Sequence, residues 1–179
     1  MKSRNVVLVL ALVIVAAACS PGSSASSVQP SGLDAAWRSA SLSDARTGES
    51  FTIDSLRGKL VAVEPMAIWC TTCRTQQGEV AAALDRLNDP DIVYVSVDVD
   101  PNERVEDLAV YADRSGFDWR FAVATADVAR SLAATFGDQI LSPPSTPLVL
   151  ISPEGEIIEH HFGIRRADEL VDLFAANAP

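Results

Sequence analysis

Apolar and polar positions along residues 37–179 follow an order typical of an α/β domain. Short apolar runs rich in β-branched residues predict buried strands, at residues 60–68, 92–99, 121–123 and 148–151, with 156–161 as the hairpin partner of the last. Apolar residues at helical spacing predict helices between them, from Cys73 to Asn88, from Val105 to near Gly116, over 127–136 and over 168–174. This order predicts a central mixed β-sheet flanked by helices.

The segment before the first long strand predicts an N-terminal β-hairpin. Residues 37–57 contain a short strand, a turn at Arg46, Thr47 and Gly48, and a second segment over 51–56. With 179 residues the chain has room for one domain of this kind, which we place at 37–179.

The first 18 residues have the pattern of a secretory signal peptide. Lys2 and Arg4 precede an unbroken apolar run over 6–15, and the small residues Ala16–Ala18 follow. The run is too short to span a bilayer comfortably, which takes about 20 residues, and no second span of that length follows. We therefore do not expect a transmembrane protein.

Cys19 follows these alanines in an arrangement that resembles a bacterial lipoprotein box. That resemblance implies a lipid on Cys19, with 19–36, rich in Ser, Gly and Pro, as a flexible tether. The protein would then be extracytoplasmic and anchored to the cell membrane by its N-terminal lipid. The alternative is cleavage after Ala18, which releases a secreted or periplasmic protein with a free Cys19.

The chain is acidic, with a formal net charge of −10 that becomes −12 when residues 1–18 are removed. This charge argues against nucleic acid as a partner, because nucleic-acid binding relies on basic side chains. It also argues against a basic face that binds anionic lipids. Membrane attachment would therefore depend on the leader or on a lipid.

The motif Trp69 to Cys73 places a C-x-x-C sequence at the junction of a strand and a helix. Two cysteines three residues apart on a first helical turn have Cα atoms roughly 5–6 Å apart, which permits a reversible disulfide. Cys70 lies at the helix N-terminus, where free N–H groups and the helix dipole favour a thiolate, so it is the expected attacking thiol. Cys73 lies inside the helix and is the expected resolving thiol.

Residues 60–73 resemble the active-site strand and motif of thioredoxins, and 37–176 are similar to the TlpA/ResA branch of extracytoplasmic thioredoxin-like proteins. The resemblance implies a thioredoxin-like fold and thiol-disulfide oxidoreductase activity. Thr146 and Pro147 match the family's cis-proline position, which faces the disulfide and contacts substrate. We therefore expect a cis bond before Pro147 and substrate binding by Thr146, Pro147 and the neighbouring Trp69, for which packing is the alternative role.

Glu64 matches the position of the buried acid of thioredoxins, six residues before Cys70. A carboxyl group on a buried strand should have a raised pKa and could relay a proton to or from Cys73. The alternative is a partly solvated glutamate without a role.

The expected activity is reduction or isomerisation of protein disulfides, because Thr71 and Thr72 supply no cation or histidine that would make a strong oxidant. No cofactor or metal is expected, and the protein should be a monomer. The resemblance implies a transmembrane thiol donor of CcdA or DsbD type as the recycling partner, with apocytochrome c as one candidate substrate.

A metal-binding function is the main alternative. A closed zinc site needs four ligands, and beside the C-x-x-C pair only Cys19, His160 and His161 remain. The two histidines are adjacent on a strand and should point to opposite faces. A copper chaperone of the Sco type shares the fold, but those proteins have C-x-x-x-C and a histidine before the late strand, where this chain has Thr146.

The other acidic residues near the motif have simpler expected roles. Glu103, Glu106 and Asp107 are predicted to form a solvated helix face. Asp98 and Asp100 are predicted to belong to a turn at the end of a strand.

Overall fold

The computed structural model of the chain describes residues 36–179. The predicted signal peptide, the predicted lipidation site Cys19 and the predicted tether up to residue 35 lie outside the described residues. The long elements are strands β3 (Leu60–Met66), β4 (Ile92–Asp98), β5 (Arg120–Val123), β6 (Leu148–Ile151) and β7 (Ile157–His161), and helices α2 (Thr71–Leu87), α3 (Val105–Ser115), α4 (Ala126–Phe136) and α5 (Ala167–Ala175). Within the described residues, no helix is long and apolar enough to cross a membrane.

The central sheet has the strand order β5-β4-β3-β6-β7. Strand β3 pairs in parallel with β4 and antiparallel with β6, while β5 pairs in parallel with β4 and β7 antiparallel with β6. All residues of β3 are buried, because helices cover both faces of the sheet at its centre. The mixed sheet predicted from the sequence is confirmed.

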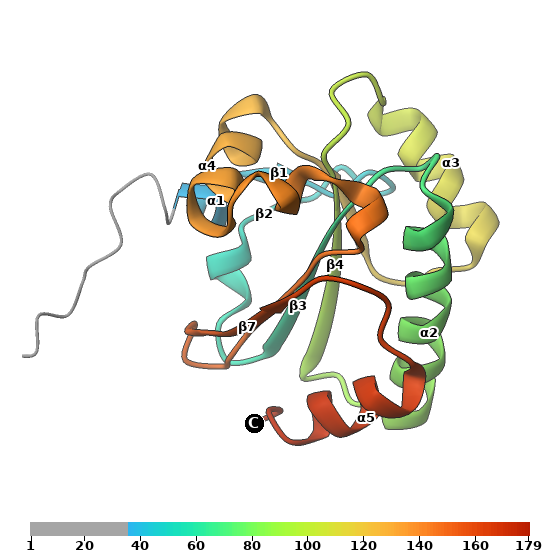
Figure 1. Cartoon of the computed structure of the whole chain (residues 1–179), viewed down its shortest axis with the longest axis vertical. Coiled ribbons are helices and arrows are strands. Elements are labelled where there is room, and N and C mark those ends of the chain that lie inside the picture. Colours follow the sequence, from blue (N-terminus) through green and yellow to red (C-terminus); the bar gives the residue numbers. More distant parts are fainter. Residues whose placement is uncertain (1–35) are drawn as a thin grey trace, which may run out of the picture.

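Each face of the sheet carries its own core. Leu60, Ala62 and Met66 of β3 pack against residues of α2, α3 and α5, whereas Val61 and Val63 pack on the other side against residues of α1 (Ala36–Ser39), α4 and the short helices. The alternation follows from the two-residue period of a strand. Figure 1 shows α2 and α5 on one side of the sheet and α1 with α4 on the other.

The N-terminal hairpin is confirmed, although its strands are short: β1 (Leu42–Ser43) pairs antiparallel with β2 (Ser50–Phe51). It is attached to the segment between α3 and β5 through Arg46, whose guanidinium donates to the carbonyl oxygens of Phe117 at 3.0 Å and Trp119 at 2.5 Å. A charged donor on two main-chain acceptors makes this a firm attachment.

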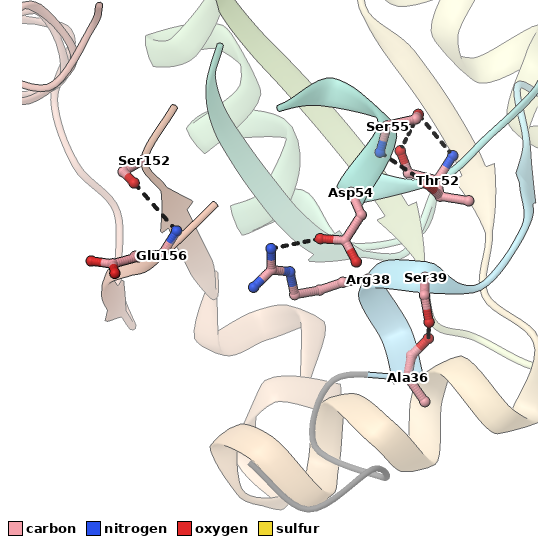
Figure 2. A network of polar contacts seen from close by, with 8 residues as sticks. All are labelled: Ala36, Arg38, Ser39, Thr52, Asp54, Ser55, Ser152 and Glu156. Atoms are coloured by element: carbon pink, nitrogen blue, oxygen red, sulfur yellow. Dashed lines mark hydrogen bonds and ion pairs between the residues drawn. The ribbon is translucent and has the colours of Figure 1, made fainter. Parts of the chain in front are cut away.

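The polar contacts near the start of the fold connect α1 with the short helix η1 (Ile53–Leu56) (Figure 2). Arg38 of α1 and Asp54 of η1 form an ion pair of 2.6 Å. Thr52 caps η1, because its side-chain oxygen accepts from the Ser55 N–H at 2.9 Å while the Ser55 hydroxyl accepts from the Thr52 N–H at 3.2 Å.

Strand β3 ends at Met66 rather than at Ile68 as the sequence predicted. The Val99 N–H still donates to the Met66 carbonyl at 2.9 Å. Ile68 lies outside the sheet, and its N–H donates to the side chain of Glu103. The last residues of the apolar run therefore form the loop that leads into the cysteine motif.

Candidate active site

Cys70 and Cys73 form a disulfide at the N-terminus of α2, with their Cα atoms 5.3 Å apart. Cys70 is the N-cap residue, and its Sγ accepts a hydrogen bond from the Cys73 N–H at 3.1 Å. The structure thus confirms that the first sulfur lies where helix N–H groups stabilise an anion. Both cysteines are buried in the disulfide form, with exposed fractions of 2% for Cys70 and 0% for Cys73.

Two contacts distinguish the sulfurs further. The Thr72 hydroxyl lies 3.2 Å from Cys70 Sγ, where it can donate to a thiolate. Cys73 Sγ lies 3.2 Å from the carbonyl oxygen of Pro143, where a thiol would donate its proton. These surroundings favour an anion on Cys70 and a neutral thiol on Cys73.

Thr146 and Pro147 are both buried directly before β6, but the bond between them is not cis as predicted. The described backbone contains no cis peptide bond. Thr146 instead adopts the left-handed conformation, with φ 46° and ψ 62°, and this makes the turn with a trans bond. The main-chain contacts to the motif come from the preceding helix η3 (Pro143–Ser145), through the carbonyls of Pro143 and Pro144.

Glu64 lies on β3 with an exposed fraction of 0%. Its Oε2 accepts from Gln77 Nε2 at 2.8 Å and from the Ser96 hydroxyl at 3.1 Å. Burial raises the pKa of this carboxyl to about 7, against the opposing effect of these two hydrogen bonds and of Tyr94. The predicted rise of the pKa is confirmed, and the solvated alternative is wrong.

A chain of hydrogen bonds surrounds Glu64. The Tyr111 hydroxyl donates to Gln77 Oε1 at 2.5 Å, and the Trp119 indole donates to the Ser96 hydroxyl at 3.0 Å. Gln77 was not identified from the sequence. Its spacing could have indicated it, because Gln77 lies four residues after Cys73 and three before Val80, and residues at this spacing share the buried face of α2.

Trp69 is the most exposed of the large apolar side chains in residues 36–179, with an exposed fraction of 56%. The indole Nε1 donates to Asp100 Oδ2 at 2.7 Å. It lines two depressions beside the disulfide: a groove of about 570 Å³ that reaches Arg74, Val110 and Tyr111, and a cleft of about 240 Å³ that reaches Pro101, Leu141 and Pro143. The indole therefore lies at the surface beside the cysteine motif.

The acidic residues near the motif differ from the sequence prediction in one respect. Glu103 does not belong to a solvated helix face, because its carboxylate accepts from the Ile68 N–H at 2.8 and 3.1 Å. The turn at the end of β4 is confirmed: the Asp100 N–H donates to Asp98 Oδ1, and the Asn102 N–H donates to Asp100 Oδ1, each at 2.9 Å.

His160 and His161 have different neighbours, as expected for adjacent residues of a strand whose side chains point to opposite faces. The His160 ring lies 5.3 Å from that of Phe136 on α4, whereas the pKa of His161 is lowered by partial burial and by Arg165. Within residues 36–179, no group of three or more His, Cys, Asp or Glu side chains is arranged to hold a metal ion.

No protein-family model and no curated protein matches the chain. Solved structures do match. A thiol:disulfide interchange protein of the thioredoxin family from Chlorobium tepidum superposes with a TM-score of 0.60 and 20% identity, covering 77% of this chain and 92% of that one. The chain has a thioredoxin-like fold.

Two further structures share this fold, one described as a disulfide oxidoreductase and the other as copper-bound. A secreted Mycobacterium tuberculosis disulfide oxidoreductase homologous to E. coli DsbE gives a TM-score of 0.62 at 15% identity, covering 78% of this chain and 97% of that one. The copper-bound ScoI of Arabidopsis thaliana gives 0.61 at 20% identity, covering 76% and 94%. At these identities the likeness establishes the thioredoxin-like fold, and the function has to be argued from the site.

Proposed function

We propose that the protein is a thiol-disulfide oxidoreductase that reduces or isomerises protein disulfides through Cys70 and Cys73. The observation that carries the proposal is the disulfide at the N-terminus of α2, with the Cys73 N–H donating to Cys70 Sγ. Solved structures of the same fold that are described as thiol:disulfide interchange and disulfide oxidoreductase proteins support it.

In the reductive direction the dithiol form begins the reaction. The Cys70 thiolate attacks a substrate disulfide, forms a mixed disulfide and releases the first substrate sulfur as a thiolate, which takes a proton from solvent. Cys73 then loses its proton and attacks Cys70 Sγ, which breaks the mixed disulfide and releases the second substrate thiolate. The substrate gains two electrons, and the Cys70–Cys73 disulfide forms.

Glu64 is the proposed acceptor for the Cys73 proton. Its pKa of about 7 suits proton transfer near neutral pH, because both the acid and the carboxylate are then populated. Gln77 connects it with α2 one turn after Cys73. Trp69 is proposed to contact the substrate with Thr146 and Pro147, since it is exposed beside the disulfide.

The cellular setting belongs to the same proposal. The C-x-x-C motif, the leader and Cys19 support an extracytoplasmic, lipid-anchored reductase of the TlpA/ResA type that works as a monomer. A transmembrane thiol protein of CcdA or DsbD type would return electrons to Cys70 and Cys73. Apocytochrome c is the candidate substrate.

The first test is the reduction potential of the cysteine pair. The purified full-length chain with Cys19→Ser is equilibrated in glutathione or dithiothreitol buffers and its thiols are trapped, so that only Cys70 and Cys73 report. A single two-electron transition below about −220 mV supports a reductase. A potential near −120 mV indicates disulfide formation instead, and the absence of a transition contradicts the proposal.

Copper binding of the Sco type is the second candidate, favoured by the likeness to copper-bound ScoI. Anaerobic titration of the reduced chain with Cu(I) separates the two. Tight stoichiometric binding that depends on His160 or His161 would favour a chaperone. Weak binding, together with exchange activity that is lost in Cys70→Ser, favours the oxidoreductase.

A further inference from the structure

The connection between β4 and α3 supplies two carboxylates that hold the loop before the disulfide. Glu103 accepts the Ile68 N–H at 2.8 and 3.1 Å, and Asp100 accepts the Trp69 indole N–H at 2.7 Å. Ile68 and Trp69 directly precede Cys70, so these bonds set the direction from which the backbone enters α2. A carboxylate that accepts a main-chain N–H makes a charge-assisted bond, stronger than a neutral one.

Asp98, the last residue of β4, interacts through its side chain with Glu103. Its exposed fraction is 0%, its Oδ1 accepts from the Asp100 N–H, and its buried Oδ2 has no donor among the N–H and neutral O–H groups of residues 36–179. The group that faces the Asp98 carboxyl is the carboxyl of Glu103, to which it is hydrogen-bonded. Two carboxylates both accept, so such a bond requires a proton on one of them.

The other surroundings of Asp98 offer no cation in compensation. Its register partners are Met66 on β3 and Val123 on β5, neither of which titrates. The charged groups that act on it are Glu103 and Asp100, both acidic. Retention of a proton is therefore the way in which this site avoids a buried charge.

We propose that Asp98 and Glu103 form a carboxyl–carboxylate pair that shares one proton and positions the backbone of Ile68 to Cys70 for disulfide exchange. Asp98 donates the shared proton to Glu103, and Glu103 holds the Ile68 N–H. Both are positioning residues, because they act through Ile68 and touch neither sulfur. The role in exchange rests on the proposed function, whereas the shared proton does not.

Loss of the shared proton should loosen the loop. Burial, followed by the interaction with Glu103, raises the pKa of Asp98 to about 8. Above that pH two anions face each other, and Glu103 must move away from Asp98 and from Ile68. The Ile68 N–H then loses its acceptor in a pH range in which the disulfide itself does not titrate.

The test follows the Ile68 amide of the oxidised, 15N-labelled full-length chain by NMR between pH 6.5 and 9.5. The expected result is a shift change with a midpoint near 8, which disappears in Asp98→Asn because an amide donates to Glu103 at every pH. Asp113→Asn is the matched control, since it makes the same substitution at an exposed site on α3 and should leave the transition in place. A flat profile in the parent chain, or an unchanged transition in Asp98→Asn, overturns the shared proton.

A second measurement tests positioning. The rate constant of the reduced chain with oxidised glutathione at pH 7 should fall by about tenfold in Glu103→Ala, with unchanged circular dichroism, and recover in Glu103→Gln, whose amide oxygen can accept from Ile68. An unchanged rate in Glu103→Ala overturns the positioning role while exchange activity stands. Absence of exchange in the parent chain contradicts the proposed function instead, and the Ile68 titration still decides the shared proton.

Discussion

The side-chain amide of Gln77 donates a hydrogen bond of 2.8 Å to the buried carboxylate of Glu64. Gln77 lies one helical turn after Cys73 on the same face of α2, so a single helix carries both the resolving sulfur and the donor that stabilises the anion of Glu64. Any displacement of α2 therefore changes the surroundings of the sulfur and of the acid together.

Glu64 should make stability depend on pH. Its pKa is about 7 in the folded chain, against 4.5 for the solvated glutamate of an unfolded chain, so the fold favours the protonated form. This contribution is complete below pH 4.5 and is lost as the pH rises to 7, which amounts to about 3 kcal/mol. Glu64→Gln should remove that part of the slope, as measured by urea unfolding at a series of pH values.

The exposed Glu106→Gln serves as the control for this slope, because it makes the same substitution on the surface of α3. It should leave the pH dependence of the parent chain unchanged. Equal slopes in Glu64→Gln and in the parent would show that Glu64 ionises normally in the folded state.

Gln77→Leu should raise the pKa of Glu64. A hydrogen bond to a charged group contributes about 1.5–3 kcal/mol, so its loss corresponds to a rise of about 1–2 pKa units. The 13C signal of the labelled Glu64 carboxyl reports the titration. Gln76→Leu is the neighbouring control, because Gln76 is equally buried but bonds to the Arg165 main chain; the same rise in both variants would exclude a specific effect of Gln77.

The two cysteines should behave differently when each is replaced alone. Cys73→Ser leaves the capping sulfur without its resolving partner, so mixed disulfides with a substrate protein should accumulate. Cys70→Ser should yield more than about tenfold less adduct, because Cys73 is fully buried and its sulfur lies against the Pro143 carbonyl. Non-reducing gels with mass spectrometry measure the adducts. Equal yields would contradict the assignment of Cys70 as the attacking thiol.

Arg46→Ala should destabilise the fold by about 2 kcal/mol, because it removes a charged donor from the two main-chain carbonyls that attach the hairpin to the segment before β5. Urea unfolding measures the loss. Arg86→Ala should change stability by less than about 1 kcal/mol, since the ion pair of Arg86 with Asp168 is exposed. Similar losses of unfolding free energy in both variants would mean that the Arg46 contacts stabilise the fold no more than an exposed ion pair does.

Local patterns in the sequence predicted the long elements well. The end of α2 was predicted from Asn88, and Asn88 does adopt the left-handed conformation that ends a helix, with φ 46°. Strand β6 begins and ends at the predicted residues, because its four apolar residues are buried between strands on both sides. Helix α1 was missed, since a single turn has no periodicity to detect.

The site could be predicted only where its chemistry is local. The C-x-x-C pair and the buried acid lie on one stretch of chain and were identified. Glu103 was misassigned because its partner, the Ile68 N–H, is 35 residues away and becomes free only where β3 leaves the sheet. The predicted cis bond before Pro147 was also wrong, since a resemblance at that position does not specify how this chain makes the turn.

Trp37 attaches α1, the first described helix, to the rest of the fold. Its side chain is buried, and its main-chain N–H donates to the Ser131 hydroxyl of α4 at 2.9 Å. Residues of α1 and α4 pack on the sheet face opposite to α2, as Figure 1 shows. The proposed tether would therefore join the fold on the face of the sheet that α4 covers, opposite to the helix that carries the cysteines.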